Sequence, residues 1–301
     1  MYDIGFPNIG LYFENVPRIM FTIPIIDRPI FWYGFMIVVG IIAAYFMGIW
    51  WVKKTGQRVE DYTDLLLFGM PFALVGLRTH YLIFMHDGVY NLQTFFATFF
   101  RFADGGLAIY GGIFGAIVAV LIVGRHKKIP FATIADTGAP SMLLGQVIGR
   151  FGNFFNREAF GGYTDSLLAM SMRAENVPGF PHGSHITEEM LEHSTFVDGY
   201  QFIQVHPTFL YEAFFNLLLM IALLIYRPRK TFNGEIVLLY LFGYGVIRFI
   251  IESLRTDQMM LFNTGLPVNQ VLAAGFAVIC AALIIMGHVR ARRPEFFRRK
   301  K

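Results

Sequence analysis

Charged residues are scarce in this chain of 301 residues, because Asp, Glu, Lys and Arg together make up only 15% of it. An average soluble domain carries about 25%, so a soluble surface is disfavoured, and the 55% content of hydrophobic residues excludes intrinsic disorder. Cysteine is nearly absent too. Cys280 stands alone, which excludes an intramolecular disulfide, a cysteine-based zinc site and a redox pair. Residues 1–20 also lack the basic and apolar regions of a cleaved signal peptide.

The sequence does contain long apolar stretches. Seven of them approach the roughly 20 residues that a helix needs to cross a bilayer. They lie at about 30–51, 64–86, 105–124, 131–150, 207–226, 234–254 and 268–288. The sequence therefore predicts an all-α, polytopic membrane protein with seven transmembrane helices, in which residues 1–301 form a single transmembrane catalytic domain.

The basic residues indicate how these spans are oriented. The segments 51–63, 124–130 and 227–233 and the tail after residue 288 hold 16 of the 25 Lys and Arg residues. Seven spans put all four segments on one side, and the positive-inside rule makes that side cytoplasmic. The N-terminus is then outside, and the polar residues 157–205 form an extracytoplasmic insert between spans four and five, with a short helix at 186–193. The basic tail suits anionic lipid head groups better than nucleic acid.

Ionisable side chains within the spans gather toward the predicted outer ends, and such residues usually mark function. In span six, Tyr244, Arg248 and Glu252 are spaced i, i+4, i+8, and Arg255 follows three residues later, so all four share one helical face. For this helix alone, an Arg248–Glu252 pair that merely neutralises itself is an equally good interpretation.

When the other spans are included, arginines outnumber the carboxylates near them, because span two carries Arg78 and span four ends at Arg150. Guanidinium groups bind phosphate in a bidentate fork and tolerate partial desolvation. The pattern predicts a cationic pocket that opens to the outer leaflet, where a phospholipid head group is the available anion.

The segment 145–162, GQVIGRFGNFFNREAFGG, is dense in glycine and in polar side chains. Arg150, Asn153 and Asn156 supply donors that can converge on a phosphate or a glyceryl ester. A capped helix followed by a polar loop explains the same residues equally well, because Gly and Asn commonly end helices.

GRFGNFFNREAFG (149–161) resembles the signature of the bacterial phosphatidylglycerol–prolipoprotein diacylglyceryl transferases. The matching residues are Gly149, Arg150, Gly152, Asn153, Phe154, Asn156, Glu158 and Gly161. Other segments are similar to the same family: FWYGFM at Tyr33, GLRTHYLIF at Arg78, HPTFLYE at 206–212 and YGVIRFIIESLR at 244–255.

This resemblance implies an enzyme of the bacterial cytoplasmic (inner) membrane whose active site faces the outer leaflet. It would move the diacylglyceryl group of phosphatidylglycerol to the thiol of the lipobox cysteine in a prolipoprotein signal peptide. A thioether forms and glycerol phosphate leaves, which is the first step of lipoprotein maturation. The expected partners are these two substrates and membrane lipids, and no cofactor, metal or nucleic acid is expected.

On this interpretation Arg150 and Arg248 clamp the phosphate, and Asn153 bonds the head group. The other expected site residues are Arg78 and Arg255 in the same field, Glu252 and Glu158 as partners that orient Arg, Tyr33 and Tyr244 at the glyceryl moiety, and Gly161 in the binding segment. The general base stays open between Tyr110, His206 and a glutamate near the arginines. Tyr110 occupies a place where many family members have His.

Two alternatives carry less weight. His182, His185 and His193 in the insert could suggest a metal site, but without an HExxH motif or a cysteine ligand a solvated loop is the better interpretation. A transporter or anion channel would also use arginine in the membrane. It usually shows internal repeats and polar groups near the midplane, and this sequence has neither pattern.

Overall fold

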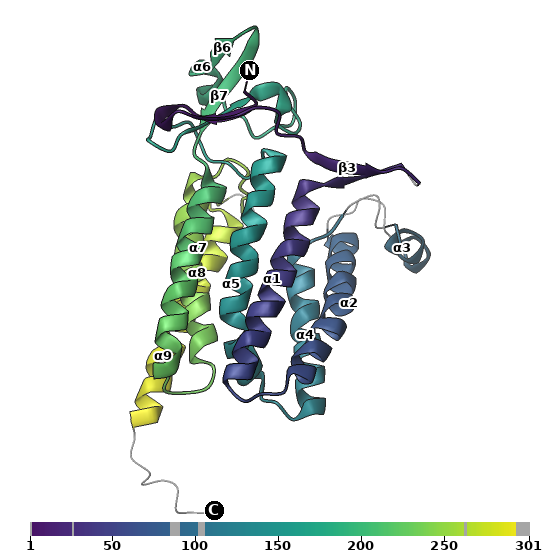
Figure 1. Ribbon diagram of the computed structural model, residues 1–301, viewed down its shortest axis with the longest axis vertical. Coiled ribbons are helices and arrows are strands. Elements are labelled where there is room, and N and C mark those ends of the chain that lie inside the picture. The colour runs from purple at the N-terminus through teal and green to yellow at the C-terminus, as the bar shows by residue number, and fades with distance from the viewer. Residues whose placement is uncertain (1, 26, 85–90, 102–105, 262–263, 293–301) are drawn as a thin grey trace, which may run out of the picture. The chain divides into compact units, whose positions relative to one another are not determined.

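The computed structural model describes residues 2–25, 27–84, 91–101, 106–261 and 264–292, and these are mostly helical (Figure 1). The long helices are α1 (Trp32–Lys54), α2 (Val59–Phe84), α4 (Ile109–Lys127), α5 (Phe131–Asn156), α7 (Thr208–Tyr226), α8 (Glu235–Leu254) and α9 (Val268–Arg292). Each predicted apolar stretch is thus confirmed as a helix.

Six of these helices are long and apolar enough to cross a membrane, namely α1, α2, α4, α7 (extended by η4, Arg227–Arg229), α8 and α9. The chain is therefore a multi-pass membrane protein. Helix α5 has 26 residues but is less apolar, because Asp136, Thr137 and Ser141 interrupt its sequence. The basic residues predicted for the tail beyond Arg292 lie outside the described residues.

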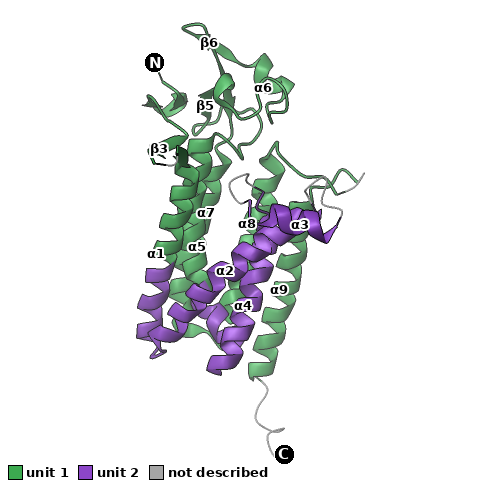
Figure 2. Ribbon diagram, turned by 90° about the vertical axis from the view of Figure 1, so that its right-hand side faces the viewer, with its two compact units in different colours: residues 1–44, 139–301 green, residues 45–138 purple. Residues whose placement is uncertain are grey.

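The chain divides into two compact units (Figure 2). Unit 1 combines Met1–Ala44 with Ala139–Lys301, and unit 2 is Tyr45–Gly138. Unit 2 thus lies between two parts of unit 1 in the sequence.

Within unit 2, α2 packs along α4, and the short amphipathic helix α3 (Leu92–Phe99) follows α2. Glycines allow the two long backbones to touch. A Cβ atom built on Gly76 would lie 2.1 Å from the carbonyl oxygen of Gly111, and one built on Gly115 would lie 2.2 Å from that of Phe72. Only hydrogen fits at these positions, as in other close helix pairs within membranes.

Within unit 1, α7, α8 and α9 pack in series. The close approach predicted for span four occurs at Gly145, whose neighbour is Gly40 of α1. At Gly149, the second predicted small residue, nothing lies within 4 Å of a built Cβ.

The expectation of an all-α protein is incomplete, since unit 1 also contains a five-stranded antiparallel sheet. The strand order is β2 (Leu11–Phe13), β1 (Ile4–Phe6), β5 (Met170–Arg173), β7 (Tyr200–Val205) and β6 (Thr195–Val197). A separate hairpin joins β3 (Ile19–Ile23) to β4 (Arg28–Phe31). The insert also contains α6 (Glu188–Glu192), which confirms the predicted short helix, and η3 (Ala174–Asn176); η1 (Pro7–Ile9) precedes β2.

The sheet packs onto the end of α5, which carries the signature segment, and onto the start of α7. Ile4, Met172 and Ile203 are fully buried in its core, together with Phe209 from the start of α7. Phe154, near the end of α5, packs against the same cluster. This apolar core fixes where α5 ends and α7 begins.

We predict that Gly76→Ala lowers the thermal unfolding midpoint of the purified protein, because the added methyl group meets the Gly111 carbonyl. Overpacking of this kind destabilises by about 1–3 kcal/mol. Gly69→Ala is the matched control, since it lies in the same helix with nothing within 4 Å of a built Cβ. Equal midpoints for the two variants would contradict the close approach of α2 and α4.

Candidate active site

A buried carboxylate joins three helices of unit 1. Glu212 of α7 is 1% exposed. Its Oε1 atom lies 2.7 Å from Nη2 of Arg150 on α5, and its Oε2 atom accepts a hydrogen bond of 3.1 Å from Nη1 of Arg248 on α8. The Tyr244 hydroxyl also donates to Oε1, at 3.3 Å. One carboxylate therefore places both arginines that the sequence assigned to a phosphate clamp.

A second carboxylate holds Arg248 from the other side. Arg248 Nη2 lies 2.5 Å from Oε2 of Glu252, one turn further along α8. Asn269 of α9 donates to the other oxygen of Glu252 at 2.9 Å. The i,i+4 pair expected in span six is thus present, but it belongs to a network of helices α5, α7, α8 and α9 rather than standing alone.

The carboxylate side chains of this network are less exposed than its arginine side chains. The Glu212 and Glu252 side chains are 2% and 1% exposed, whereas those of Arg150 and Arg248 are 22% and 13% exposed. With both carboxylates ionised the four charges cancel. An anion that approaches from the more exposed side meets the guanidinium N–H groups before the carboxylate oxygens.

The signature segment surrounds this network with polar contacts. Asn153 donates from Nδ2 to Oε1 of Glu158 at 3.0 Å, and both residues follow Arg150 at the end of α5. Tyr33 lies close to Gly152, where a built Cβ would be 2.7 Å from Cδ2 of the ring. Tyr33 is also within electrostatic range of Arg150 and Glu158.

Arg255, at the end of α8, already has an anionic partner. Its Nε and Nη2 atoms lie 2.7 and 2.5 Å from the two carboxylate oxygens of Asp257. Burial alone would raise the pKa of the Asp257 carboxyl, but this bidentate pair outweighs burial and holds the pKa below its usual range. The sequence did not identify Asp257 as this partner.

Gly161 joins three parts of unit 1. Its N–H donates to the His206 carbonyl at 2.9 Å, and the next residue, Gly162, donates to the Leu254 carbonyl at 3.0 Å. A Cβ on Gly161 would lie 2.6 Å from the Leu254 oxygen and 2.8 Å from Cβ of His206. Glycine is therefore required for the signature segment to reach the start of α7 and the end of α8 together.

The imidazole of His206 is half-buried, and its Nδ1 atom lies 3.3 Å from the Tyr211 hydroxyl. Burial lowers the pKa of His206, because it disfavours the charged imidazolium. The side chain is therefore neutral at pH 7.

Comparison with known proteins decides the family. The family model for prolipoprotein diacylglyceryl transferase matches residues 18–286. A phosphatidylglycerol–prolipoprotein diacylglyceryl transferase of Bacillus cytotoxicus is 34% identical over 282 residues, which cover 88% of this chain and 93% of the relative. One of Clostridium novyi is 34% identical over 259 residues, covering 86% and 92%.

The chain belongs to the prolipoprotein diacylglyceryl transferase family.

Most of the site residues predicted for this diacylglyceryl transferase lie in unit 1. They are Arg150, Arg248, Tyr244 and Glu252 in the network, with Tyr33, Asn153, Glu158, Gly161, His206 and Arg255 on the segments described above. Glu212, the centre of the network, was not among the predicted site residues. Its signal was its place in HPTFLYE, in the second turn of an apolar helix, but the sequence does not show which arginines face it.

Arg78 and Tyr110 of the transferase belong to unit 2. Arg78 is 1% exposed, and its guanidinium donates to the backbone carbonyls of Thr98, Phe99, Arg101 and Gly106 at 2.8–3.1 Å. These contacts tie residues 98–101 and Gly106 to α2. Tyr110 is 44% exposed near the start of α4, with its ring centroid 6.3 Å from that of His80.

We predict that Glu212→Gln destabilises the transferase, since the substitution leaves Arg150 and Arg248 close together without the charge between them. Removing one partner of a buried ion pair costs about 3–5 kcal/mol, which thermal unfolding of the purified protein will show as a lower midpoint. Glu192→Gln makes the same charge change on the exposed face of α6 and leaves the midpoint unaltered. A midpoint for Glu212→Gln equal to that of this control would contradict the assignment.

Proposed function

We propose that this chain transfers the diacylglyceryl group of phosphatidylglycerol to the lipobox cysteine of prolipoproteins. Its family membership supports the reaction, and its relatives carry that activity in their names. The observation that carries the proposal is the pairing of Arg150 and Arg248 on the buried Glu212.

In this reaction the phosphodiester of the lipid lies against the open side of the two arginines. Glu212 and Glu252 keep the guanidinium groups in place from behind, so little reorganisation is needed when substrate binds. The thiolate sulfur attacks the glyceryl carbon, a C–S bond forms, and the C–O bond to phosphate breaks. Glycerol phosphate leaves with one more negative charge than the diester had, and preorganised cations stabilise such developing charge.

The thiol must lose its proton during the attack. The candidate acceptors are His206, which is neutral at pH 7, Tyr110 in unit 2 and a glutamate near the arginines. Asn153 bonds the head group, whereas Tyr33 and Tyr244 orient the glyceryl moiety. Glu158 orients Asn153, with which it shares a hydrogen bond. Arg255 and Arg78 contribute positive charge at the rim where the substrate enters, although each already contacts other groups of the chain.

The sheet supports seven membrane crossings. Ile4 pairs with Met172, so β1 and β5 lie on the same side of the membrane. Between these strands the chain runs through α1, α2, α4 and α5, and it returns to its own side only after an even number of crossings. Helices α1, α2 and α4 alone would make an odd number, so α5 crosses as well despite its polar residues.

The remaining helices complete the topology. Helices α7, α8 and α9 add three crossings after β7, which puts the C-terminus on the side opposite the sheet. The basic loops make that side cytoplasmic. The insert 157–205 then faces outward with the active site, in the bacterial cytoplasmic (inner) membrane, and residues 1–301 act as one catalytic domain.

We predict that Arg150→Ala and Arg248→Ala each lower transferase activity at least 100-fold, because each removes a charge-assisted contact to the phosphate. The measurement is the gel shift of a lipobox peptide incubated with phosphatidylglycerol and the purified protein. Arg229→Ala, in the basic segment after α7, keeps wild-type activity. Wild-type turnover by both site variants would exclude the clamp, and solute flux in liposomes without lipid chemistry would favour a transporter instead.

The pH dependence of the reaction distinguishes His206 from Tyr110 as the base. The pKa of His206 is lowered from 6.5, so if His206 is the base, kcat/KM stays constant at neutral pH and falls only below pH 6.5 as the imidazole is protonated. We expect His206→Gln to lower activity and to remove this acid limb, while Tyr110→Phe leaves the limb in place. An unchanged limb in His206→Gln, together with an inactive Tyr110→Phe, would assign the proton to Tyr110.

A further inference from the structure

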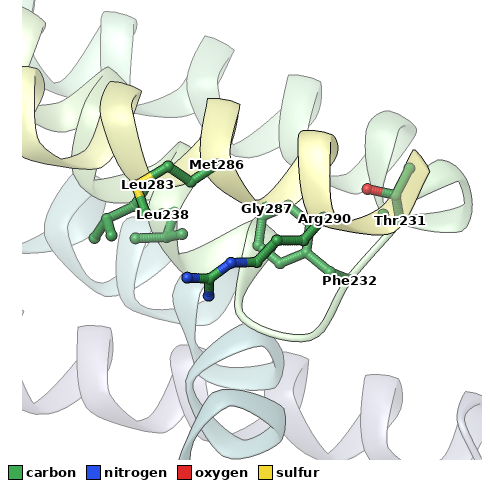
Figure 3. Close-up of a pocket in the computed structure, with 8 residues that line it drawn as sticks. Thr231, Phe232, Leu238, Leu283, Met286, Gly287 and Arg290 are labelled. Atoms are coloured by element: carbon green, nitrogen blue, oxygen red, sulfur yellow. The ribbon is translucent and has the colours of Figure 1, made fainter. Parts of the chain in front are cut away.

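A groove lies at the end of unit 1 where α8 begins and α9 ends, far along both helices from the Arg248–Glu252 network. Its volume is about 520 Å³ (Figure 3). Leu238 of α8 and Leu283 and Met286 of α9 line it, and Phe232 precedes α8. These apolar walls belong to α8 and α9, two of the helices that are long and apolar enough to cross a membrane.

The groove depends on Gly287. A Cβ built there would lie 2.4 Å from the ring of Phe232, so the ring packs directly on the α9 backbone and forms the floor. Leu283 and Met286 remain 43% and 48% exposed beside it. A flat aromatic floor with flexible aliphatic walls suits one hydrocarbon chain.

Among the described residues that line the groove, Arg290 is the one cation. Its side chain runs back from the last turn of α9 toward the Leu283 and Leu238 end of the groove (Figure 3). A lysine or arginine at the end of a spanning helix normally extends toward water. The opposite direction at Arg290 brings its guanidinium alongside the apolar walls.

The buried carboxylate at this end of unit 1 already has other partners and does not pair with Arg290. Glu235 is fully buried and accepts from the Tyr226 hydroxyl and the Thr231 N–H, both at 2.5 Å, while His288 Nε2 lies 3.1 Å away. Within the described part of the chain, Arg290 forms neither a hydrogen bond nor an ion pair. Its charge is therefore available to an external anion.

We propose that this groove binds one anionic phospholipid of the adjacent leaflet, at a site separate from the active site. An acyl chain lies along Leu238, Leu283 and Met286, and the phosphate pairs with Arg290. Charge complementarity selects the ligand: a head group with net negative charge neutralises the guanidinium, whereas choline in a zwitterionic lipid competes with it for the phosphate. The site does not depend on the proposed reaction, because it shares no residue with the arginine network.

The test is native mass spectrometry of the full-length protein released from detergent with phosphatidylserine or phosphatidylcholine added. We expect one retained phosphatidylserine and little phosphatidylcholine. Arg290→Gln lowers the phosphatidylserine occupancy about fivefold, which corresponds to the roughly 1 kcal/mol that one basic residue contributes at an anionic membrane surface. Leu283→Trp, which fills the groove, lowers it as well.

Arg292→Gln is the matched control, because it removes the same charge two residues later in α9 but does not line the groove. Its occupancy stays at the wild-type level, and Arg290→Gln keeps wild-type transferase activity. Equal losses in the Arg290 and Arg292 variants would show unspecific attraction to a basic helix end and overturn the proposal. Loss of the lipid in Arg150→Ala, with retention in Arg290→Gln, would place the lipid in the active site and overturn it too.

Discussion

The arrangement of the site depends on the ion pairs of Glu212 with Arg150 and Arg248. In a low-dielectric environment two guanidinium groups repel each other strongly, so they share one site only when an anion lies between them. The carboxylate supplies that anion from α7, and the arginines come from α5 and α8. Three helices are thereby fixed at one depth, and the positive charge faces the open side with its geometry set before any substrate arrives.

The buried arginines show that the acceptors around a guanidinium decide its role. Arg78 is the most deeply buried of them, and its N–H groups are directed at backbone carbonyls of the following segment. These carbonyls accept from its donors, so Arg78 fixes residues 98–101 and Gly106 against α2. Arg248 is paired with the carboxylates of Glu212 and Glu252, which balance its charge and hold its guanidinium group in place.

Features that depend on a local sequence pattern could be predicted from the sequence. Apolar runs predicted the long helices, and i,i+4 spacing predicted the shared face of Tyr244, Arg248 and Glu252. The sheet was not predictable in this way, because β1 is a three-residue strand whose partner β5 lies far along the chain, and β5 pairs in turn with β7. The central position of Glu212 was missed for the same reason, since periodicity within α7 does not reveal the arginines on two other helices.

The pairing of β1 with β5 also sets an order for folding. Ile4–Phe6 is made first, yet its partner Met170–Arg173 follows only after the whole of unit 2 and α5 have been synthesised. Closing so long a loop is entropically costly and slow compared with pairing neighbouring helices. Helices α2 and α4, which are close in sequence, can associate early. The arginine network is completed only when α8 has been made, so a chain interrupted before α8 has its first strand and its signature segment but lacks Arg248 and Glu252.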